Sequence, residues 1–157
     1  MQNLFTSFKD NCGFGLLASI DNKQSHKNLE DAITALSRMM HRGAIAADGK
    51  TGDGSGLLLS IPKKFFSKVA KKEGITLPET YAVCMVFSKN DSDIDVINQI
   101  CQNNDLRVVF SRVVPVDTDA LGVQALEMLP DIKQIFVTPN SLMGSRRFDA
   151  LDRKSVV

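Results

Sequence analysis

The amino-acid sequence predicts a mixed α/β fold in which strands alternate with helices. The chain has 157 residues, of which 43% are hydrophobic and 24% charged, as in globular domains that bury a core. Short apolar runs alternate along it with apolar residues spaced three and four apart, which are the patterns of strands and amphipathic helices. Taken alone, this alternation favours βαβ units around a parallel sheet.

The first half of the chain predicts two strands and two helices. Phe14–Ile20 and Leu57–Ile61 are almost continuously apolar, which is typical of strands buried on both faces. A helix begins at the N-cap Ser25 and stops before Gly43, and a shorter helix covers Pro62–Lys72. The longer helix has one apolar stripe that we expect to face a core: Leu29, Ala32, Ile33, Leu36, Met39 and Met40.

The second half predicts three further strands, at Tyr81–Phe87, Leu106–Val114 and Ile132–Val137. A helix between the first two of these has the inward residues Ile94, Ile97, Ile100 and Cys101. Leu121–Leu129 predicts a short helix, and Ser145–Arg153 has the pattern of the start of another.

The charge balance argues against several classes of partner. Nineteen basic and eighteen acidic residues give a formal net charge of +1, which is no electrostatic reason to expect a nucleic acid or an anionic membrane. No apolar run approaches the ~20 residues of a membrane span. Met1–Asn11 lacks the basic and apolar regions of a signal peptide, and we interpret it as a short leader.

The three cysteines, Cys12, Cys84 and Cys101, lie far apart in the sequence and form no Cys-x-x-Cys or Cys/His set. No metal site is therefore predicted. Free thiols fit a reducing compartment, so we predict a cytoplasmic protein. Cys84 and Cys101 lie inside apolar patterns and are predicted core residues.

Cys12 lies between a polar segment and the apolar run that follows Gly15. A cysteine in such a setting is most often a small buried residue. If residues 1–11 were removed, however, Cys12 would carry both a thiol and a free α-amino group. The pKa of an α-amino group is about 8, so part of it is neutral at pH 7 and can serve as the base that an N-terminal nucleophile needs.

Several motifs follow Cys12 in a fixed order: Cys-Gly-Phe-Gly, a helix, His-Arg-Gly-Ala, Ala-Asp-Gly-Lys-Thr-Gly-Asp-Gly-Ser-Gly and Ile-Pro-Lys-Lys-Phe-Phe. This ordered set resembles the start of the class II, N-terminal-nucleophile glutamine amidotransferase domain of the glutamate synthase large chain. The likeness is close through about Phe66 and looser through Tyr81–Phe87 and Ile132–Val137. It implies that residues 12–157 are the N-terminal portion of that domain, a partial and truncated four-layer α/β/β/α sandwich with mainly antiparallel sheets.

The resemblance also implies roles for three residues. Cys12 attacks the side-chain amide of glutamine, ammonia leaves, and water releases glutamate from the thioester. Arg42 helps to hold the new amino terminus and the thiol, whereas its alternative role is that of a solvent-facing cation at a helix end. Asp53 lies in a glycine-rich segment that lines the glutamine pocket in the family, and on its own this segment predicts only a bend.

Two other interpretations of these motifs fail on the sequence. The segment Gly52–Gly56 lacks the Gly-Lys-Ser/Thr order and the glycine spacing of a phosphate-binding loop. Cys12, His41 and Asp53 have the residue types of a catalytic triad, but the amine of Cys12 supplies the base without them.

The family places its oxyanion hole on a downstream Asn-Gly pair, whereas Asn140 is followed by Ser141. We therefore expect little or no glutaminase activity from the chain alone. The resemblance implies glutamine as substrate and a synthase region or second subunit as partner. The flavin and iron–sulfur centre belong to that synthase region, and no cofactor is expected here. The alternative function is that of a catalytically inactive remnant or an interaction module.

Overall fold

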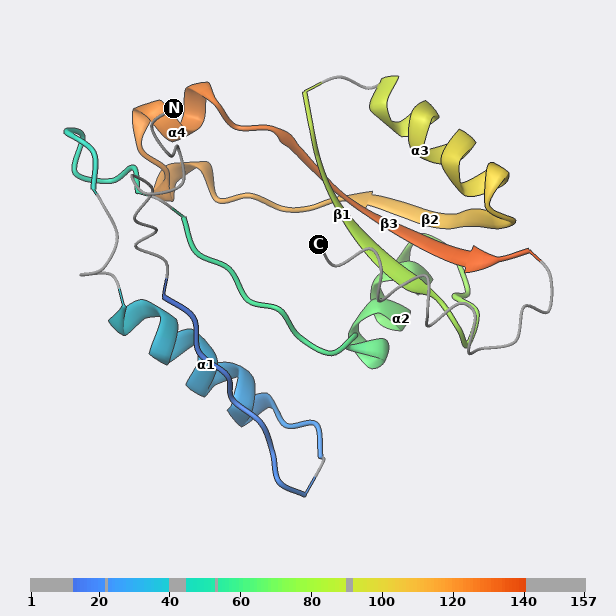
Figure 1. The fold of residues 1–157 in the computed structure, drawn as a ribbon, viewed down its shortest axis with the longest axis horizontal. Coiled ribbons are helices and arrows are strands. Elements are labelled where there is room, and N and C mark those ends of the chain that lie inside the picture. Colours follow the sequence, from blue (N-terminus) through green and yellow to red (C-terminus); the bar gives the residue numbers. More distant parts are fainter. Residues whose placement is uncertain (1–12, 22, 40–44, 53, 90–91, 141–157) are drawn as a thin grey trace, which may run out of the picture. The chain divides into compact units, whose positions relative to one another are not determined.

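The computed structural model describes residues 13–21, 23–39, 45–52, 54–89 and 92–140. These residues form two units, one made of residues 13–58 and 118–127 and the other of residues 59–117 and 128–140. Figure 1 shows the elements of each unit. None of the helices in the described part of the chain has the length and apolar character of a membrane span.

The second unit is built on a three-stranded sheet with the strand order β1-β3-β2 (Figure 1). Its strands are β1 (Ala82–Ser88), β2 (Leu106–Val113) and β3 (Asp131–Pro139). Both outer strands pair antiparallel with β3, so β1 and β2 run parallel to each other with β3 between them. Helix α3 (Ser92–Asn103) connects β1 to β2, which makes the unit a split β-α-β arrangement.

The strand pairing corrects the expectation of a parallel sheet. Periodicity predicted all three strands of this unit, but it carries no information on strand direction. Because β3 returns between two parallel strands, every ladder is antiparallel, as the family resemblance implied. The described residues contain this one small sheet and not the two stacked sheets of a four-layer sandwich.

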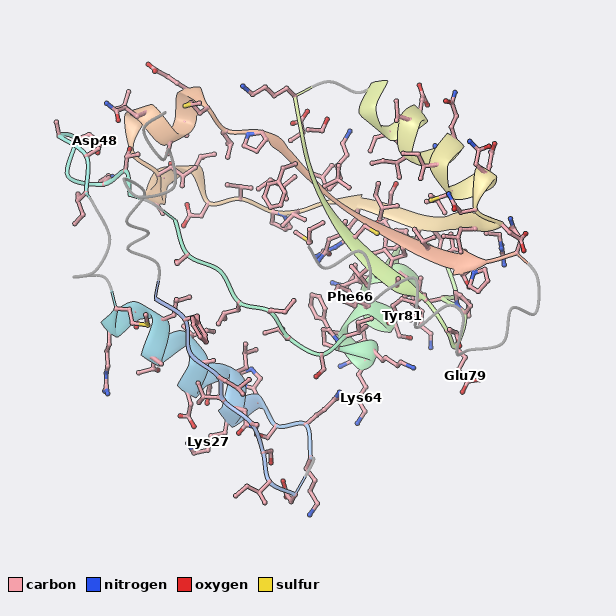
Figure 2. The ribbon with its side chains drawn as sticks, viewed as in Figure 1. Lys27, Asp48, Lys64, Phe66, Glu79 and Tyr81 are labelled. Atoms are coloured by element: carbon pink, nitrogen blue, oxygen red, sulfur yellow. The ribbon has the colours of Figure 1, made fainter. Side chains whose placement is uncertain are left out.

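The two faces of the sheet bury different side chains. Helix α2 (Lys63–Lys72) supplies Phe66 and Ala70 to one cluster, in which they pack with Tyr81, Phe110 and Phe136. Figure 2 shows Phe66 and Tyr81 in this part of the unit. In the other cluster, Cys101 of α3 packs with Ile135 and Val137. Alternate residues of β3 thus reach opposite faces, as the period of a strand requires.

Phe136 is the centre of the α2-side cluster and is fully buried. Its ring centroid lies 5.0 Å from that of Phe66, 5.2 Å from that of Phe110 and 5.8 Å from that of Tyr81. Aromatic pairs at these separations contribute about 0.5–1.5 kcal/mol beyond their buried area. The core of this unit therefore depends on one aromatic side chain of the central strand.

A β-bulge in β2 sets which of its residues reach that core. Val108 pairs with Val137 and Phe110 pairs with Phe136, so Val109 is an extra residue on β2. Without the extra residue, Phe110 would pair with Ile135 and point to the α3 face, because side chains alternate along a strand. The bulge therefore places both Val109 and Phe110 on the α2 face.

The hydroxyl group of Tyr81 is buried, and within the described residues it has no hydrogen-bond partner. Burial raises the pKa of this hydroxyl above its ordinary value. A buried polar group without a partner costs about 1–3 kcal/mol. We therefore expect Tyr81→Phe to raise the free energy of unfolding by up to about 1 kcal/mol. The measurement is urea denaturation monitored by circular dichroism. A loss of stability instead would show that the hydroxyl is bonded.

Two predicted core residues of the second unit lie at the surface. Cys101 is buried as expected, but Cys84 is exposed and Ile100 is 55% exposed. Cys84 pairs with Ile135 on the α3 side of the sheet, and α3 packs mainly against β2. The outer strand β1 is therefore left uncovered at Cys84. The apolar pattern predicted strand β1 correctly, but it wrongly predicted that Cys84 is buried.

In the first unit, helix α1 (His26–Arg38) forms where the sequence predicts it. The Ser25 hydroxyl oxygen accepts a hydrogen bond from the backbone N–H of Asn28 at 3.2 Å, as an N-cap does. Lys27, labelled in Figure 2, donates to Asp31 at 2.6 Å one turn later. The apolar stripe was expected to face a core, but no residue of α1 is buried. The N-cap and the apolar spacing are enough to form the helix, whereas burial of the apolar stripe requires another element that packs against it.

Candidate functional site

The predicted site residues Cys12, Arg42 and Asp53 lie outside the described residues, and so do His41 and the leader Met1–Asn11. The structure therefore describes the segments that adjoin them. These are the segment after Cys12, helix α1, the turn between Ile45 and Gly52, and the segment that begins at Gly54.

The segments predicted as buried strands at Phe14–Ile20 and Leu57–Ile61 are not strands in the structure. Phe14 is 98% exposed and Leu58 is 90% exposed. A strand exists only when another strand supplies hydrogen bonds, and within the described residues neither segment is paired in a ladder. Each apolar run thus has the composition of a buried strand, but most of its residues are exposed in this structure.

The turn that precedes Asp53 is closed by its own backbone. Ile45 and Gly52 form an isolated antiparallel bridge, and the Ala46 N–H donates to the Thr51 carbonyl at 2.8 Å. Gly49 has a φ of +70°, in the left-handed region that glycine adopts without strain. The bridge holds together Ile45 and Gly52, the residues from which the chain continues toward Arg42 and Asp53.

Asp48 organises the inside of this turn (Figure 2). Its Oδ1 accepts from the backbone N–H groups of Lys50 at 3.0 Å and Thr51 at 2.8 Å, and its Oδ2 accepts from the Thr51 hydroxyl at 2.5 Å. These bonds, the Thr51 hydroxyl foremost, lower the pKa of Asp48 to about 2, and the backbone N–H of Gln124 adds a smaller lowering.

The same turn contacts a segment about seventy residues later in the chain. Gly122 is buried, and a Cβ there would collide with the Thr51 hydroxyl and Asp48 Oδ2 and lie 2.7 Å from the Thr51 nitrogen. The Lys50 Nζ also donates to the backbone carbonyl of Asp119 at 3.4 Å. We call Asp48, Thr51, Gly122 and Gln124 the Asp48 cluster. It joins the turn to the start of the short helix α4 (Val123–Glu127).

The lowered pKa of Asp48 predicts how the stability of the turn depends on pH. The folded-state pKa is about 2 and the ordinary value is 3.8, so the hydrogen bonds stabilise the turn fully above about pH 4 and lose this effect as the pH falls through 2. Carboxyl-carbon NMR is expected to show Asp48 titrating near pH 2. Thr51→Val, which removes the first cause of the shift, moves the titration upward. A wild-type midpoint near 3.8 would contradict the geometry.

The described residues of the glycine-rich segment after the turn, 54–56, have no regular secondary structure. Gly54 has a φ of +82°, again in the left-handed region. The segment does not enter a strand. His26, in the first turn of α1, is exposed, and its Nδ1 lies 3.4 Å from Glu30 Oε1. The described residues contain no group of three or more His, Cys, Asp or Glu side chains that could hold a metal ion.

The Asp48 cluster is the feature that sequence reasoning missed. Asp48-Gly49 is an Asp-Gly pair, which is a sequence signal for a turn. Nothing in the pattern indicated that the turn contacts Gly122. The one available sign was a glycine directly before a helical pattern, and this arrangement is too common among helices to indicate a particular contact.

Comparison with known proteins places the chain in a family. The model of class-II glutamine amidotransferases matches residues 12–154 and so begins at Cys12. The chain is 39% identical over 133 residues to ferredoxin-dependent glutamate synthase 2, chloroplastic, of Arabidopsis thaliana, covering 80% of this chain and 8% of that protein. It is 38% identical over 143 residues to ferredoxin-dependent glutamate synthase of Cyanidium caldarium, covering 87% and 9%.

A third relative is the glutamate synthase [NADPH] large chain of Bacillus subtilis, which is 35% identical over 137 residues, covering 84% of this chain and 9% of the relative. The chain thus spans less than a tenth of the length of these relatives. The family model, in contrast, covers nearly all of the chain. The chain belongs to the class-II glutamine amidotransferase family.

Proposed function

We propose that this chain supplies the nucleophile-bearing part of the glutamine amidotransferase site of a glutamate synthase. The observation that carries the proposal is the family match, which begins at Cys12. The three relatives described above are all named glutamate synthases. Removal of residues 1–11 would give Cys12 a free α-amine beside its thiol, which is the pair of groups that the chemistry needs.

The proposed reaction has two steps. The Cys12 thiolate attacks the side-chain amide carbon of glutamine, and the C–N bond breaks as ammonia leaves with a proton that the α-amine took from the thiol. Water then attacks the thioester, releases glutamate and returns the thiol. Arg42 is proposed to hold the amino terminus and the thiol, and Asp53 to line the glutamine pocket.

We further propose that turnover needs polypeptide beyond this chain. No oxyanion donor can be named in the sequence, and loss of one such donor typically lowers the rate by about 10²–10³-fold. The proposed four-layer sandwich likewise needs more strands than the three described. The flavin and iron–sulfur centre are proposed for the synthase region, and glutamine and that region are the proposed partners.

A non-catalytic interaction role is the second candidate. The observation in its favour is the exposed apolar surface of the first unit, with Phe14, Leu16 and Ile20 each at least 89% exposed. Such surfaces typically bind other polypeptide. A clean monomer in size-exclusion chromatography would count against this candidate.

The proposed location is a reducing compartment such as the cytoplasm. It rests on the sequence, in which three cysteines lie far apart and form no Cys-x-x-Cys or Cys/His set. The Arabidopsis relatives are named chloroplastic or chloroplastic/mitochondrial, so family membership alone does not fix the compartment.

A chimera tests the proposed function. Residues 12–154 would replace the matched segment of the Bacillus subtilis large chain, and glutamate release from glutamine would be measured. We expect the chimera to hydrolyse glutamine and the isolated chain to show little or no activity. A folded chimera without glutaminase activity would overturn the proposal.

A further inference from the structure

We propose that the outer edge of strand β2 is a self-association surface. A second copy of this chain adds its own β2 there, antiparallel to the first, about a two-fold axis at Ser111. All the residues that form this surface belong to the second unit. Self-association at this edge is independent of the proposed glutamine chemistry, so each can fail without the other.

Strand β2 lies at one side of the sheet, because the strand order is β1-β3-β2 (Figure 1). The Val114 N–H donates to the Ile132 carbonyl of β3 at 2.8 Å. Since the backbone groups of a strand point alternately to its two sides, Ser111 and Val113 direct theirs away from β3. Among the described strands, none lies on that side of β2. Backbone groups presented in this way form a template for a further strand.

An open groove of about 740 Å³ follows this edge. It is lined by residues 108–113 of β2 and by Val69, Glu73 and Ile75, which belong to α2 and the segment directly after it. Most of the lining is apolar, and its two charged residues are Glu73 and Arg112. An added strand would therefore meet an apolar surface that carries one charge of each sign.

The two charges lie toward opposite ends of the groove. Arg112 Cζ lies 5.8 Å from the ring centroid of Phe65, in the first turn of α2, and Arg112 Nε donates to Gln134 Oε1 at 2.7 Å. Glu73 is the C-cap of the same helix, about 12 Å farther along its axis than Phe65. A free amino acid, whose two charged groups share one carbon atom, is too short to bridge Glu73 and Arg112.

A two-fold axis at Ser111 reverses the direction of the groove in the second copy. The Glu73 end of each copy then meets the Arg112 end of the other, which gives two pairs of opposite charges. Such an isologous contact requires each copy to supply both members of the pair, as Glu73 and Arg112 do here. This charge complementarity favours a second copy over an unrelated polypeptide as the occupant.

The neighbouring registers are less favourable. An axis at Arg112 would place two arginines directly opposite each other, and like charges in that position are destabilising. An axis at Val113 would set Ser111 against Pro115, which has no N–H to donate. An axis at Ser111 avoids both conflicts and makes Ser111 and the partner's Ser111 a hydrogen-bonded pair.

A cysteine cross-link in the full chain tests the register. The Cα atoms of a hydrogen-bonded antiparallel pair lie about 5.5 Å apart, within the range of a disulfide, so Ser111→Cys is expected to link two copies. Val113→Cys is the matched control, because Val113 is 69% exposed on the same edge. Its Cα would lie about 13 Å from that of the partner's Val113, too far for a disulfide.

The cross-links are measured by peptide mass spectrometry after mild oxidation, which distinguishes them from disulfides of the native cysteines. We expect at least about tenfold more self-linked peptide from Ser111→Cys than from Val113→Cys.

A charge exchange tests the complementarity. Glu73 is exposed, and Glu73→Arg is expected to raise the dimer dissociation constant at least about tenfold in analytical ultracentrifugation, because it creates two like-charge contacts. Adding Arg112→Glu should return the constant to within about threefold of the wild-type value, which a general loss of folding cannot do. Glu79→Arg makes the same change at an exposed glutamate outside the groove, labelled in Figure 2, and should leave the constant unchanged.

A wild-type chain that is monomeric at every concentration reached would overturn the inference, even if a strand from another polypeptide bound at the edge. Dimers that link equally at both cysteine positions, or that ignore Glu73→Arg, would also overturn it. Should the doubly exchanged variant not fold, the two cysteine variants still decide the register. Failure of the proposed function is seen separately, as an absence of glutaminase activity in the chimera.

Discussion

Replacing Phe136 with alanine is expected to lower the free energy of unfolding of the sheet-containing unit by about 3–5 kcal/mol. The side chain is fully buried and its ring contacts those of Phe66, Tyr81 and Phe110. Its removal loses the transfer free energy of the ring and leaves a cavity between two layers. A loss of this size is a large fraction of the stability of a small domain.

Tyrosine fluorescence during urea unfolding provides the measurement. The chain has one tyrosine and no tryptophan, so its emission comes from Tyr81, inside the affected cluster. Phe87→Ala is the matched control, because Phe87 lies on an outer strand and is 64% exposed. Equal losses from the two substitutions would show that Phe136 is not the centre of the core.

Replacing Cys12 with alanine is expected to abolish glutamine hydrolysis by the chimera, by at least ~10³-fold in kcat/KM. Without the thiol no thioester forms, whatever groups surround the glutamine. Cys12→Ser keeps a nucleophilic atom of weaker reactivity and is expected to leave a trace of activity at most.

Two controls make the prediction specific to Cys12. Cys84→Ala and Cys101→Ala remove the other thiols, of which the first is exposed and the second has its pKa raised by burial. Neither is expected to change kcat by more than about twofold at a temperature where the chimera stays folded. Full activity of the Cys12→Ala chimera would assign the chemistry to another residue.

The sequence predicted those elements whose local signals and partners both lie in the described chain. Helix α2 and strands β1, β2 and β3 formed within one or two residues of their predicted limits. Helix α1 also formed, because Ser25 and the apolar spacing act locally. Its burial was predicted wrongly, as were the strands at Phe14–Ile20 and Leu57–Ile61, because burial and strand pairing depend on partners that a local pattern does not identify.

Only those parts of the candidate site that belong to recognisable sequence motifs could be predicted. The ordered motifs from Cys12 onward identified the family, since each glycine and charged residue has a fixed place in the order. They did not identify Asp48, whose contacts with Gly122 and Gln124 join parts of the chain about seventy residues apart. The bulge at Val109 was equally invisible, because one extra residue leaves the apolar pattern of β2 intact.

The most direct test of the central claim, that Cys12 is an N-terminal nucleophile for glutamine, is intact mass spectrometry of the chimera before and after treatment with 6-diazo-5-oxo-norleucine, a reactive glutamine analogue. We predict the mass of a chain whose first residue is Cys12. After treatment we predict a single covalent adduct, which peptide mapping assigns to Cys12. A chimera that is folded, begins at Cys12 and remains unlabelled, or is labelled at another residue, would contradict the claim.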